Sequence, residues 1–391
     1  MKQAVILAAG EGQRLRPFTV NKPKSMLTIA DKPILQYVIS ALAQNGIRNI
    51  VLVVGYKREQ VFDYMGSGEQ FGVDITYITQ ESQLGSAHAL AQTRDATEKE
   101  FLVLSGDNLI GADTLTQFLA IKPPAVLTKR VENPDRYGVV TVAEGKVQEI
   151  TEKPREPQSN VVSTGIYAFT QEIFDFIDDQ LTIPEVLNSM IAQGHQIKAE
   201  ATEGTWHDVV YPWDILRLND ALLRQVENEV SGTIETDVSL KRPVSIGKNS
   251  IVRSNSYIVG PVVIGENCDI GPNVCIMPST SIGDNVVISP FTEVSNSVIA
   301  NHINIGPSSI IRDSVIDSGC CIAGRFTATS DEVEVKVDHE HHLVHMGAIL
   351  GEGCNLGSGV VAEPGAIVGN HCRVRSLKLL GGRLPDGSLV V

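Results

Sequence analysis

The sequence lacks a long hydrophobic run and is short of positive charge. Its apolar N-terminal stretch, Val5 to Ala9, is too short for a transmembrane helix and is not followed by a signal-peptide cleavage pattern, so we expect a cytoplasmic protein. Asp and Glu outnumber Lys and Arg by 46 to 32, which gives a formal net charge of −14. Because nucleic acids and anionic membranes require a basic surface, we expect neither as the main partner.

Cysteines are few, and none belongs to a Cys-x2-Cys pair. All six lie in the last third of the chain: Cys268, Cys275, Cys320, Cys321, Cys354 and Cys372. This spacing suits neither a zinc knuckle nor a disulfide framework, so we expect small buried thiols in a reducing compartment.

What is present is the composition of an ordinary globular protein, with 42% apolar and 20% charged residues. The 391 residues exceed one typical domain, so we expect two. Up to about residue 225, strand-like runs at 4–7, 50–54, 75–78 and 101–104 alternate with helical patterns, one of them from Pro33 to Gly46. This order predicts an open α/β sheet of Rossmann-like type, in which ligands bind beyond the carboxyl ends of the strands.

From about residue 244 the pattern changes to a period of six. Aliphatic residues recur at every sixth position from Ile246 to Ile288, often with glycine next, as at Gly247. After a shift in phase the repeat returns, most clearly from Leu350 onward. This is the hexapeptide pattern of a parallel β-helix. We therefore expect an α/β domain at 1–225, a linker at 226–243 and a β-helix at 244–391.

The first strand-like run ends in a glycine pair. Gly10 and Gly12 free backbone N–H groups to approach a phosphate, and Arg14 and Lys24 add positive charge where a triphosphate would lie. The segment is not a P-loop, and Leu15 stands where a dinucleotide fingerprint needs a third glycine. A Gly-x-Gly pair by itself is also typical of ordinary turns.

A longer pattern surrounds this pair: Leu7-Ala8-Ala9-Gly10-x-Gly12-x-Arg14-Leu15-x-Pro17, followed by Lys22-Pro23-Lys24. It resembles the signature of the sugar-1-phosphate nucleotidyltransferases. With its repeat region, the whole chain resembles the bifunctional sugar-1-phosphate uridylyltransferase/acetyltransferase enzymes of archaeal type, whose β-helix is left-handed. It also resembles pyrophosphorylases in which the β-helix only organises the oligomer.

The resemblance implies which groups handle the triphosphate. Two residues would be catalytic, Arg14 and Lys24, by neutralising the developing charge and the leaving pyrophosphate. The residues implied to line the substrate there are Leu7, Ala9, Gly10 and Gly12. Mg²⁺ would be held by Asp107, after a buried strand, and by Asp208 in Trp206-His207-Asp208-Val209. From the residues alone, capping of the following helix is an equal alternative for Asp107.

The segment that runs from Gln80 to Ser86 resembles the base-recognition loop of the family. An amide both donates to and accepts from a pyrimidine edge, so Gln80, with Gln83, Gly85 and Ser86, would bind uracil or thymine. UTP is the preferred nucleotide, and dTTP stays open. The alternative is a polar turn before a helix that starts near Ser86.

Three segments match the sugar side of the family pattern. Gly138 would let the sugar lie against the backbone, while Glu152 would bind hydroxyls and Lys153 the sugar phosphate. Gly165 lies in Ser163-Thr164-Gly165, where the family often has asparagine at the first position. Glucose 1-phosphate and N-acetylglucosamine 1-phosphate both stay open. Taken alone, Glu152 and Lys153 would be an ordinary surface pair.

The repeat region holds one candidate for a second activity. Asn301-His302-Ile303-Asn304 resembles the segment that carries the general base of β-helix acetyltransferases, which implies His302 and acetyl-CoA. An outward corner residue without a role is the equal alternative. Alternating valines from Val333 to Val337, before a histidine cluster at 339–345, predict a protruding hairpin. Its histidines either bind metal or line an exposed loop or a subunit contact.

These features predict an Mg²⁺-dependent enzyme that joins a nucleoside triphosphate to a hexose 1-phosphate, with acetyl transfer as a further activity. The alternatives are a nucleotidyltransferase whose β-helix only oligomerises, and a non-catalytic scaffold like certain exchange-factor subunits. Since such β-helices commonly assemble around a threefold axis, we expect a homotrimer or a multiple of it.

Overall fold

The computed structural model describes residues 1–337 and 340–391. The chain divides into two compact units: unit 1 comprises residues 1–11, 22–26 and 33–208, and unit 2 comprises residues 12–21, 27–32 and 209–391. The loop that carries Arg14 therefore belongs to the same unit as the repeat region. The partition in chain order at 225 and 243 stays a prediction.

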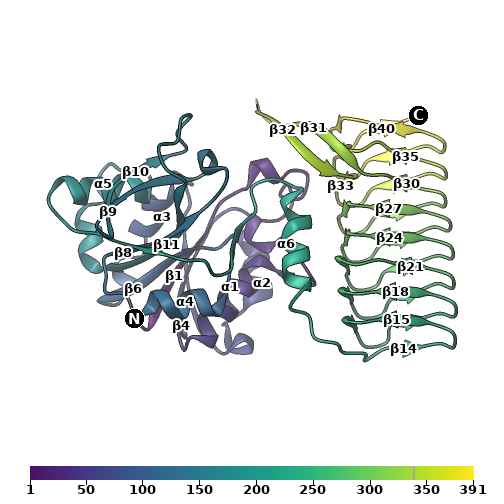
Figure 1. The fold of residues 1–391 in the computed structure, drawn as a ribbon, viewed down its shortest axis with the longest axis horizontal. Helices are drawn as coiled ribbons and strands as arrows, with labels where there is room; N and C mark the ends of the chain where they lie inside the picture. Colours follow the sequence, from purple (N-terminus) through teal and green to yellow (C-terminus); the bar gives the residue numbers. More distant parts are fainter. Residues whose placement is uncertain (338–339) are drawn as a thin grey trace. The chain divides into compact units, whose positions relative to one another are not determined.

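Unit 1 is built on a nine-stranded mixed sheet with the order β5-β4-β1-β6-β11-β8-β12-β10-β9 (Figure 1). The strands are β1 (Gln3–Ala8), β4 (Asn49–Val54), β5 (Asp74–Thr79), β6 (Glu100–Ser105), β8 (Ala125–Arg130), β9 (Gly138–Ala143), β10 (Lys146–Glu152), β11 (Val161–Thr170) and β12 (Lys198–Ala201). The first four in the sheet order run parallel, and β11 is antiparallel to β6. The predicted α/β sheet and its four predicted strands are confirmed.

Helices cover both faces of this sheet. Ala4 and Ile6 of β1 contribute to the core formed with α1 (Ile34–Gln44), α2 (Arg58–Met65) and α4 (Ala112–Leu119). Val5 contributes to the opposite core, formed with α3 (Ser86–Ala91) and α5 (Ile183–Ala192). Alternate residues of β1 thus face opposite cores, as strand geometry requires. The helix predicted between Pro33 and Gly46 is α1.

The strand order reverses between β1 and β6, which is the switch point of the sheet. The Gly106 N–H donates to the Leu7 carbonyl at 2.9 Å, so the carboxyl ends of these two strands lie together. Gly10 and Asp107 follow these two strands. Open α/β sheets bind ligands in the crevice at such a point.

Shorter elements complete the chain outside the repeat region. They are β2 (Thr28–Ile29), β3 (Lys32–Pro33), β7 (Asn108–Ile110), β13 (Trp206–Asp208) and the 3-10 turns η1 (Gln13–Leu15), η2 (Lys24–Met26), η3 (Glu69–Phe71), η4 (Arg94–Ala96), η5 (Pro134–Arg136) and η6 (Gln171–Asp175). No helix in residues 1–337 and 340–391 is both long enough and apolar enough to span a bilayer.

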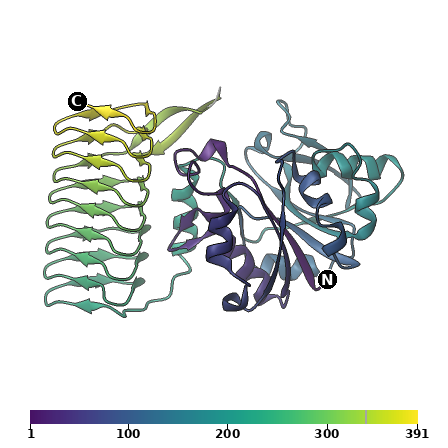
Figure 2. The same ribbon diagram turned by 180° about the vertical axis from the view of Figure 1, so that it is seen from behind.

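Unit 2 contains α6 (Asp214–Leu223) and a left-handed parallel β-helix with three parallel sheets (Figures 1 and 2). Sheet E holds β14 (Thr233–Ile234), β17 (Ile251–Val252), β20 (Asp269–Ile270), β23 (Val287–Ile288), β26 (Asn304–Ile305), β29 (Cys321–Ile322), β34 (Asn355–Leu356), β37 (Arg373–Val374) and β40 (Leu389–Val390). Sheet F holds β15 (Ser239–Lys241), β18 (Tyr257–Val259), β21 (Cys275–Ile276), β24 (Glu293–Ser295), β27 (Ile310–Arg312), β30 (Thr327–Ala328), β35 (Val361–Ala362) and β38 (Leu379–Leu380). Sheet D holds β16 (Val244–Ile246), β19 (Val262–Ile264), β22 (Thr280–Ile282), β25 (Val298–Ile299), β28 (Val315–Ile316), β33 (Ile349–Leu350), β36 (Ile367–Val368) and β39 (Arg383–Leu384). The first two strands, β14 and β15, lie within the segment predicted as a linker.

The predicted repeat residues point into the core of the coil. Those from Ile246 to Ile288 are at most 1% exposed. The phase shift in the sequence arises because the coil shortens: Ile246 pairs with Ile264, and partners there lie 18 positions apart. Ile282 pairs with Ile299, and partners there lie 17 positions apart. One residue is therefore missing from each of the two coils between Ile282 and Ile316, whereas Ile349 and Ile367 are again 18 positions apart.

The hairpin predicted after residue 330 is present. β31 (Asp331–Val337) and β32 (Glu340–Met346) pair antiparallel between β30 and β33. His339, part of the predicted histidine cluster, lies outside the described residues. Among the described residues no group of three His, Cys, Asp or Glu side chains is placed to hold a metal ion.

The cysteines are free thiols, and four of them are buried in the coil: Cys268, Cys320, Cys354 and Cys372. The interpretation of most of them as small buried thiols is confirmed, while Cys321 is exposed.

Candidate functional site

Two carboxylates far apart in the sequence meet beyond the end of β6. Asp107 follows β6 after Gly106, and Asp208 is the last residue of β13. Because β13 pairs antiparallel with β7, Asp208 lies opposite Asn108, the neighbour of Asp107. This short two-stranded ladder brings the two predicted metal ligands together.

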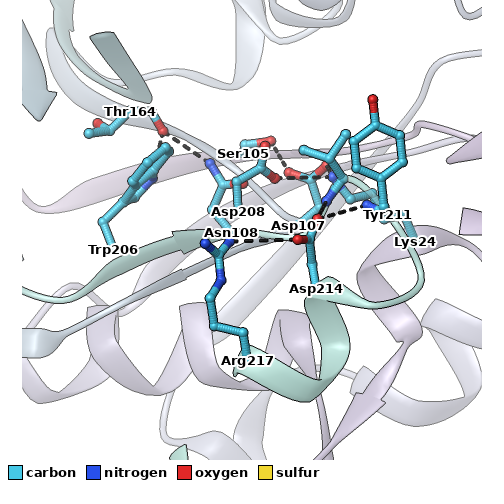
Figure 3. Close-up of polar contacts among 11 residues, drawn as sticks. Lys24, Ser105, Asp107, Asn108, Thr164, Trp206, Asp208, Tyr211, Asp214 and Arg217 are labelled. Carbon is cyan, nitrogen blue, oxygen red and sulfur yellow. Dashed lines mark hydrogen bonds and ion pairs between the residues drawn. The ribbon is translucent and has the colours of Figure 1, made fainter. Parts of the chain in front are cut away.

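Lys24 bridges the two carboxylates (Figure 3). Its Nζ lies 2.5 Å from Asp107 Oδ2 and 3.3 Å from Asp208 Oδ1. The side chains of Lys24, Asp107 and Asp208 are 16%, 27% and 16% exposed. The helix-cap alternative for Asp107 is wrong, because the next helix, α4, is capped by Gly111.

The charges of this cluster stabilise one another. Burial by itself would raise the pKa of Asp107, but the nearby Lys24 charge and hydrogen bonds from Lys24 and Ser105 lower that pKa below its usual range. Burial also opposes the charge of Lys24, and the two carboxylates outweigh it, so the pKa of Lys24 is raised. Asp107 is therefore ionised and Lys24 protonated at neutral pH.

The donor set fits Mg²⁺. In phosphate chemistry this ion is typically held by one or two carboxylates, while water and substrate phosphates complete its octahedral shell. Asp107 and Asp208 supply such a pair. The ammonium group of Lys24 already lies against both, which shows that the position stabilises positive charge.

A hydrogen-bond network connects the carboxylates to the neighbouring strand β11. Asn108 Nδ2 and Trp206 Nε1 both donate to the Thr164 carbonyl, each at 3.0 Å (Figure 3). Next to Thr164, Gly165 has a φ of +75°, which glycine adopts without strain. A Cβ at Gly165 would lie 3.5 Å from Asn108 Nδ2. The predicted sugar-side glycine therefore lies beside the carboxylate cluster.

The other predicted sugar-side residues meet on the β9–β10 ladder. Gly138 pairs with Glu152, and a Cβ at Gly138 would lie 3.2 Å from Glu152 Oε2. Lys153 Nζ lies 3.6 Å from Glu152 Oε1, and the two side chains are 50% and 46% exposed. The structure brings these three residues together, and their contact with a sugar stays a prediction.

Gln80 is buried at the end of β5 and braces the loop that follows. Its Nε2 donates to the Gly85 carbonyl at 3.1 Å. Gly85 has a φ of +147°, and a Cβ there would collide with the Leu181 carbonyl. Ser86 begins α3, as predicted, and its Oγ accepts from the Ile183 N–H at 3.0 Å. The loop is thus ordered from both sides, and base recognition stays a prediction.

Gly55 lies close to predicted site residues, although no motif indicated it. It follows β4, and a Cβ there would lie 3.0 Å from Ala9 Cβ, Gln80 O and Gln83 Nε2. The missing side chain lets the loops after β1 and β5 approach each other. Its one signal in the sequence is a glycine directly after a strand, as at Gly10.

The glycine pair is divided between the units. Gly10 belongs to unit 1, whereas Gly12 and Arg14 belong to unit 2. Gly12 has a φ of +71°, and its carbonyl accepts from the Leu15 N–H at 2.9 Å and from Thr19 Oγ1 at 2.7 Å. These bonds form the turn η1, which carries Arg14. The contact of Arg14 with a triphosphate stays a prediction.

His302 lies at an exposed corner of the coil. It has a φ of +58°, and its N–H donates to the Asp284 carbonyl at 2.9 Å. The same corner position of the preceding coils holds Asn249, Asn267 and Asn285, also with positive φ. His302 therefore replaces an asparagine in a structural ladder, and its role as a base stays a prediction beside that alternative.

The known families match the chain in separate parts, one in the region of the α/β pattern and two in the region of the six-residue repeat. Residues 3–225 match the nucleotidyl transferase family. Residues 258–336 match the GMPPB C-terminal domain, and residues 347–376 match the hexapeptide repeat of succinyl-transferase.

Two archaeal proteins are similar along almost the entire chain. Bifunctional protein GlmU of Methanocaldococcus jannaschii is 34% identical over 402 residues, covering 99% of this chain and 97% of its own. The bifunctional sugar-1-phosphate nucleotidylyltransferase/acetyltransferase of Sulfurisphaera tokodaii is 32% identical over 397 residues, covering 95% of each chain. Among solved structures, a putative glucose-1-phosphate thymidylyltransferase from Bacillus anthracis is 30% identical with a TM-score of 0.53, over 58% of this chain and 97% of that one.

Proposed function

Because the chain belongs to the nucleotidyl transferase family, we propose that it transfers a nucleotidyl group from a nucleoside triphosphate to a sugar 1-phosphate and releases pyrophosphate. The observation that carries the proposal is Lys24 bridging Asp107 and Asp208 at the switch point of the sheet. Buried charges of this kind, placed where open sheets bind ligands, are typical of catalytic sites.

In the proposed reaction an oxygen of the sugar 1-phosphate attacks the α-phosphorus of the triphosphate in line with the leaving pyrophosphate. One P–O bond forms as another breaks, so the enzyme needs no covalent nucleophile. Lys24 stabilises the charge that develops on the phosphates, and Arg14 stabilises the pyrophosphate. Mg²⁺ bound by Asp107 and Asp208 would neutralise phosphate charge and align the reacting groups.

For the nucleotide we propose UTP, with dTTP as the alternative. The support for a pyrimidine is the loop from Gln80 to Ser86, which the bonds of Gln80 to Gly85 and of Ser86 to Ile183 order. The similar structure from Bacillus anthracis is named as a thymidylyltransferase, which supports the dTTP alternative. For the sugar we propose glucose 1-phosphate or N-acetylglucosamine 1-phosphate, because Glu152 offers a carboxylate to hydroxyl groups beside Gly138.

For the β-helix we propose transfer of an acetyl group from acetyl-CoA to an amino-sugar 1-phosphate, with His302 as general base. The support is the exposed imidazole and the similarity to a protein named as an acetyltransferase. The alternative is a β-helix that only assembles the oligomer. We also propose a cytoplasmic location, which the buried thiols favour.

The test is to incubate the protein with Mg²⁺ and a panel of triphosphates and sugar 1-phosphates, with and without acetyl-CoA, and to identify products by mass. We expect a nucleotide sugar and pyrophosphate, most rapidly with UTP. The absence of any nucleotide sugar would favour the non-catalytic scaffold. The absence of acetylated product from glucosamine 1-phosphate would remove the second activity.

The matched variants are Asp107→Asn and Asp95→Asn, since Asp95 is an exposed acid of the same unit. Asp107→Asn is expected to lower kcat by at least about 100-fold, as loss of one electrostatic group in an active site typically does. Asp95→Asn is expected to leave kcat unchanged. An Asp107→Asn enzyme with the wild-type rate would contradict the proposed site.

A further inference from the structure

The loop of residues 12–21 is held by the last coils of the β-helix, within unit 2. Three hydrogen bonds join them: Arg383 Nη2 to the Arg16 carbonyl at 3.4 Å, Asn370 Nδ2 to the Pro17 carbonyl at 3.0 Å, and Asn21 Nδ2 to Glu352 Oε2 at 2.9 Å. Both carbonyls belong to residues that follow Arg14 closely in the chain.

Asn370 is the buried member of this set, at 2% exposure. Its Oδ1 accepts from the Glu352 N–H and its N–H donates to Asp386 Oδ1, each at 2.7 Å. These two bonds join successive coils. The remaining side-chain group, Nδ2, is the one that binds the Pro17 carbonyl.

Earlier coils contain the same kind of hydrogen bond, from a backbone N–H to a side-chain oxygen of the next coil, but do not use it beside the loop. Asn301 Oδ1 accepts from the Asp284 N–H at 2.9 Å, and Asp284 Oδ1 accepts from the Glu266 N–H at 2.7 Å. Asparagine and aspartate both serve at this position because the coil needs only an acceptor oxygen. What Asn370 adds is an amide donor, which an aspartate lacks at neutral pH.

We propose that Asn370 is a positioning residue for nucleotidyl transfer, which orders the loop that carries Arg14, so that the β-helix is a working part of the transfer machinery. The inference rests on the proposed function, because it takes effect through Arg14. A buried bond to the backbone orders the loop before substrate arrives and lowers the entropy lost on binding. Small displacements of a catalytic group are costly, up to about 100-fold for 1 Å.

The decisive variant is Asn370→Asp. It keeps the acceptor for the Glu352 N–H but places a carboxylate oxygen against the Pro17 carbonyl. We expect kcat/KM for the triphosphate to fall about 10-fold or more, with KM for the sugar 1-phosphate unchanged. Asn301→Asp makes the same chemical change at the same coil position away from the loop, and should stay within about twofold of wild type. Wild-type kinetics for Asn370→Asp would overturn the inference.

A double-mutant cycle with Arg14→Ala separates positioning from general destabilisation. If Asn370 acts through Arg14, Asn370→Asp has no further effect on kcat/KM in the Arg14→Ala background. Losses that add in the double variant would overturn the inference. Full activity of Arg14→Ala by itself would instead remove Arg14 from the proposed function, and the inference with it.

If Asn370→Asp does not fold, a variant of the exposed Arg383 tests the inference instead. Arg383→Met loses the bond to the Arg16 carbonyl without disturbing the core, and we expect a rise of about two- to threefold in KM for the triphosphate. Arg375→Met changes an exposed arginine of the neighbouring coil and should leave this KM unchanged. Equal KM values for the two variants would overturn the inference.

Discussion

At the residue scale, the candidate site depends on polar groups whose burial is compensated by specific partners. Lys24 and Asp107 hold each other in the charged state, and Ser105 donates to Asp107 as well. Tyr167 shows the opposite case. Burial raises its pKa to about 12, which Glu152 reinforces and a hydrogen bond from Ser163 opposes, so the phenol stays neutral in the fold.

This shift predicts a loss of stability in alkali. The unfolded chain releases the Tyr167 proton near pH 10 and the folded chain near pH 12, so the free energy of unfolding falls as pH rises between these values. At 1.36 kcal/mol per pKa unit the contribution is roughly 2–3 kcal/mol. We expect Tyr167→Phe to remove this part of the decline, as measured by urea unfolding from pH 9 to 12. Equal declines in the variant and the wild type would contradict this assignment.

At the element scale, the ends of secondary structure order the loops of the site. Helix α5 begins with a capping box, in which Thr182 accepts from the Glu185 N–H and Glu185 accepts from the Thr182 N–H at 2.9 Å. The same turn binds the start of α3. The Ala87 N–H donates to the Leu181 carbonyl at 2.9 Å, and Ser86 Oγ accepts from the Ile183 N–H. The start of α5 therefore supports the loop from Gln80.

Removal of this cap should weaken both the helix and the loop. We expect Thr182→Ala to lower the free energy of unfolding by about 1 kcal/mol and Thr182→Ser to restore most of it. Chemical denaturation measures the first effect. The effect on the loop is measured by KM for the triphosphate, which we expect to rise in the alanine variant only. A stable alanine variant with unchanged KM would show that the cap supports neither.

At the scale of the whole molecule, sheet F of the β-helix carries a row of outward-facing apolar side chains. On sheet F the outward residues include Ile310, Val361 and Leu379, of which Leu379 is 64% exposed. Exposed apolar residues aligned along a flat sheet are typical of an interface. We propose that three copies of the chain associate through sheet F, since hexapeptide-repeat helices commonly form trimers.

Light scattering tests this assembly. We expect a trimer or a multiple of it for the wild type, and dissociation for Leu379→Glu, because the new carboxylate would be buried without a partner. Leu389→Glu is the control, since Leu389 is 67% exposed on sheet E. A monomeric wild-type protein, or equal dissociation of both variants, would refute the proposed interface.

Local periodicity was enough to predict four strands of the sheet, one helix and the repeat region. Strands such as β1 and β6, the helix α1 and the coils from Ile246 were predictable because their side chains alternate with periods that the backbone itself imposes. The glycine at position 12 was also predictable as a turn residue. Family resemblance supplied Asp208, which no local pattern distinguishes from a surface acid.

Tertiary structure decided what the site is made of. The pairing of β7 with β13 brings Asp208 to Asp107, and Gly55 matters only because the loops after β1 and β5 meet above it. The bond from Asn370 to the Pro17 carbonyl joins segments near the two ends of the chain. Such contacts depend on register between segments remote in sequence, which local propensity does not encode. The sequence by itself therefore determined the two architectures and their elements, and the fold decided which side chains share a site.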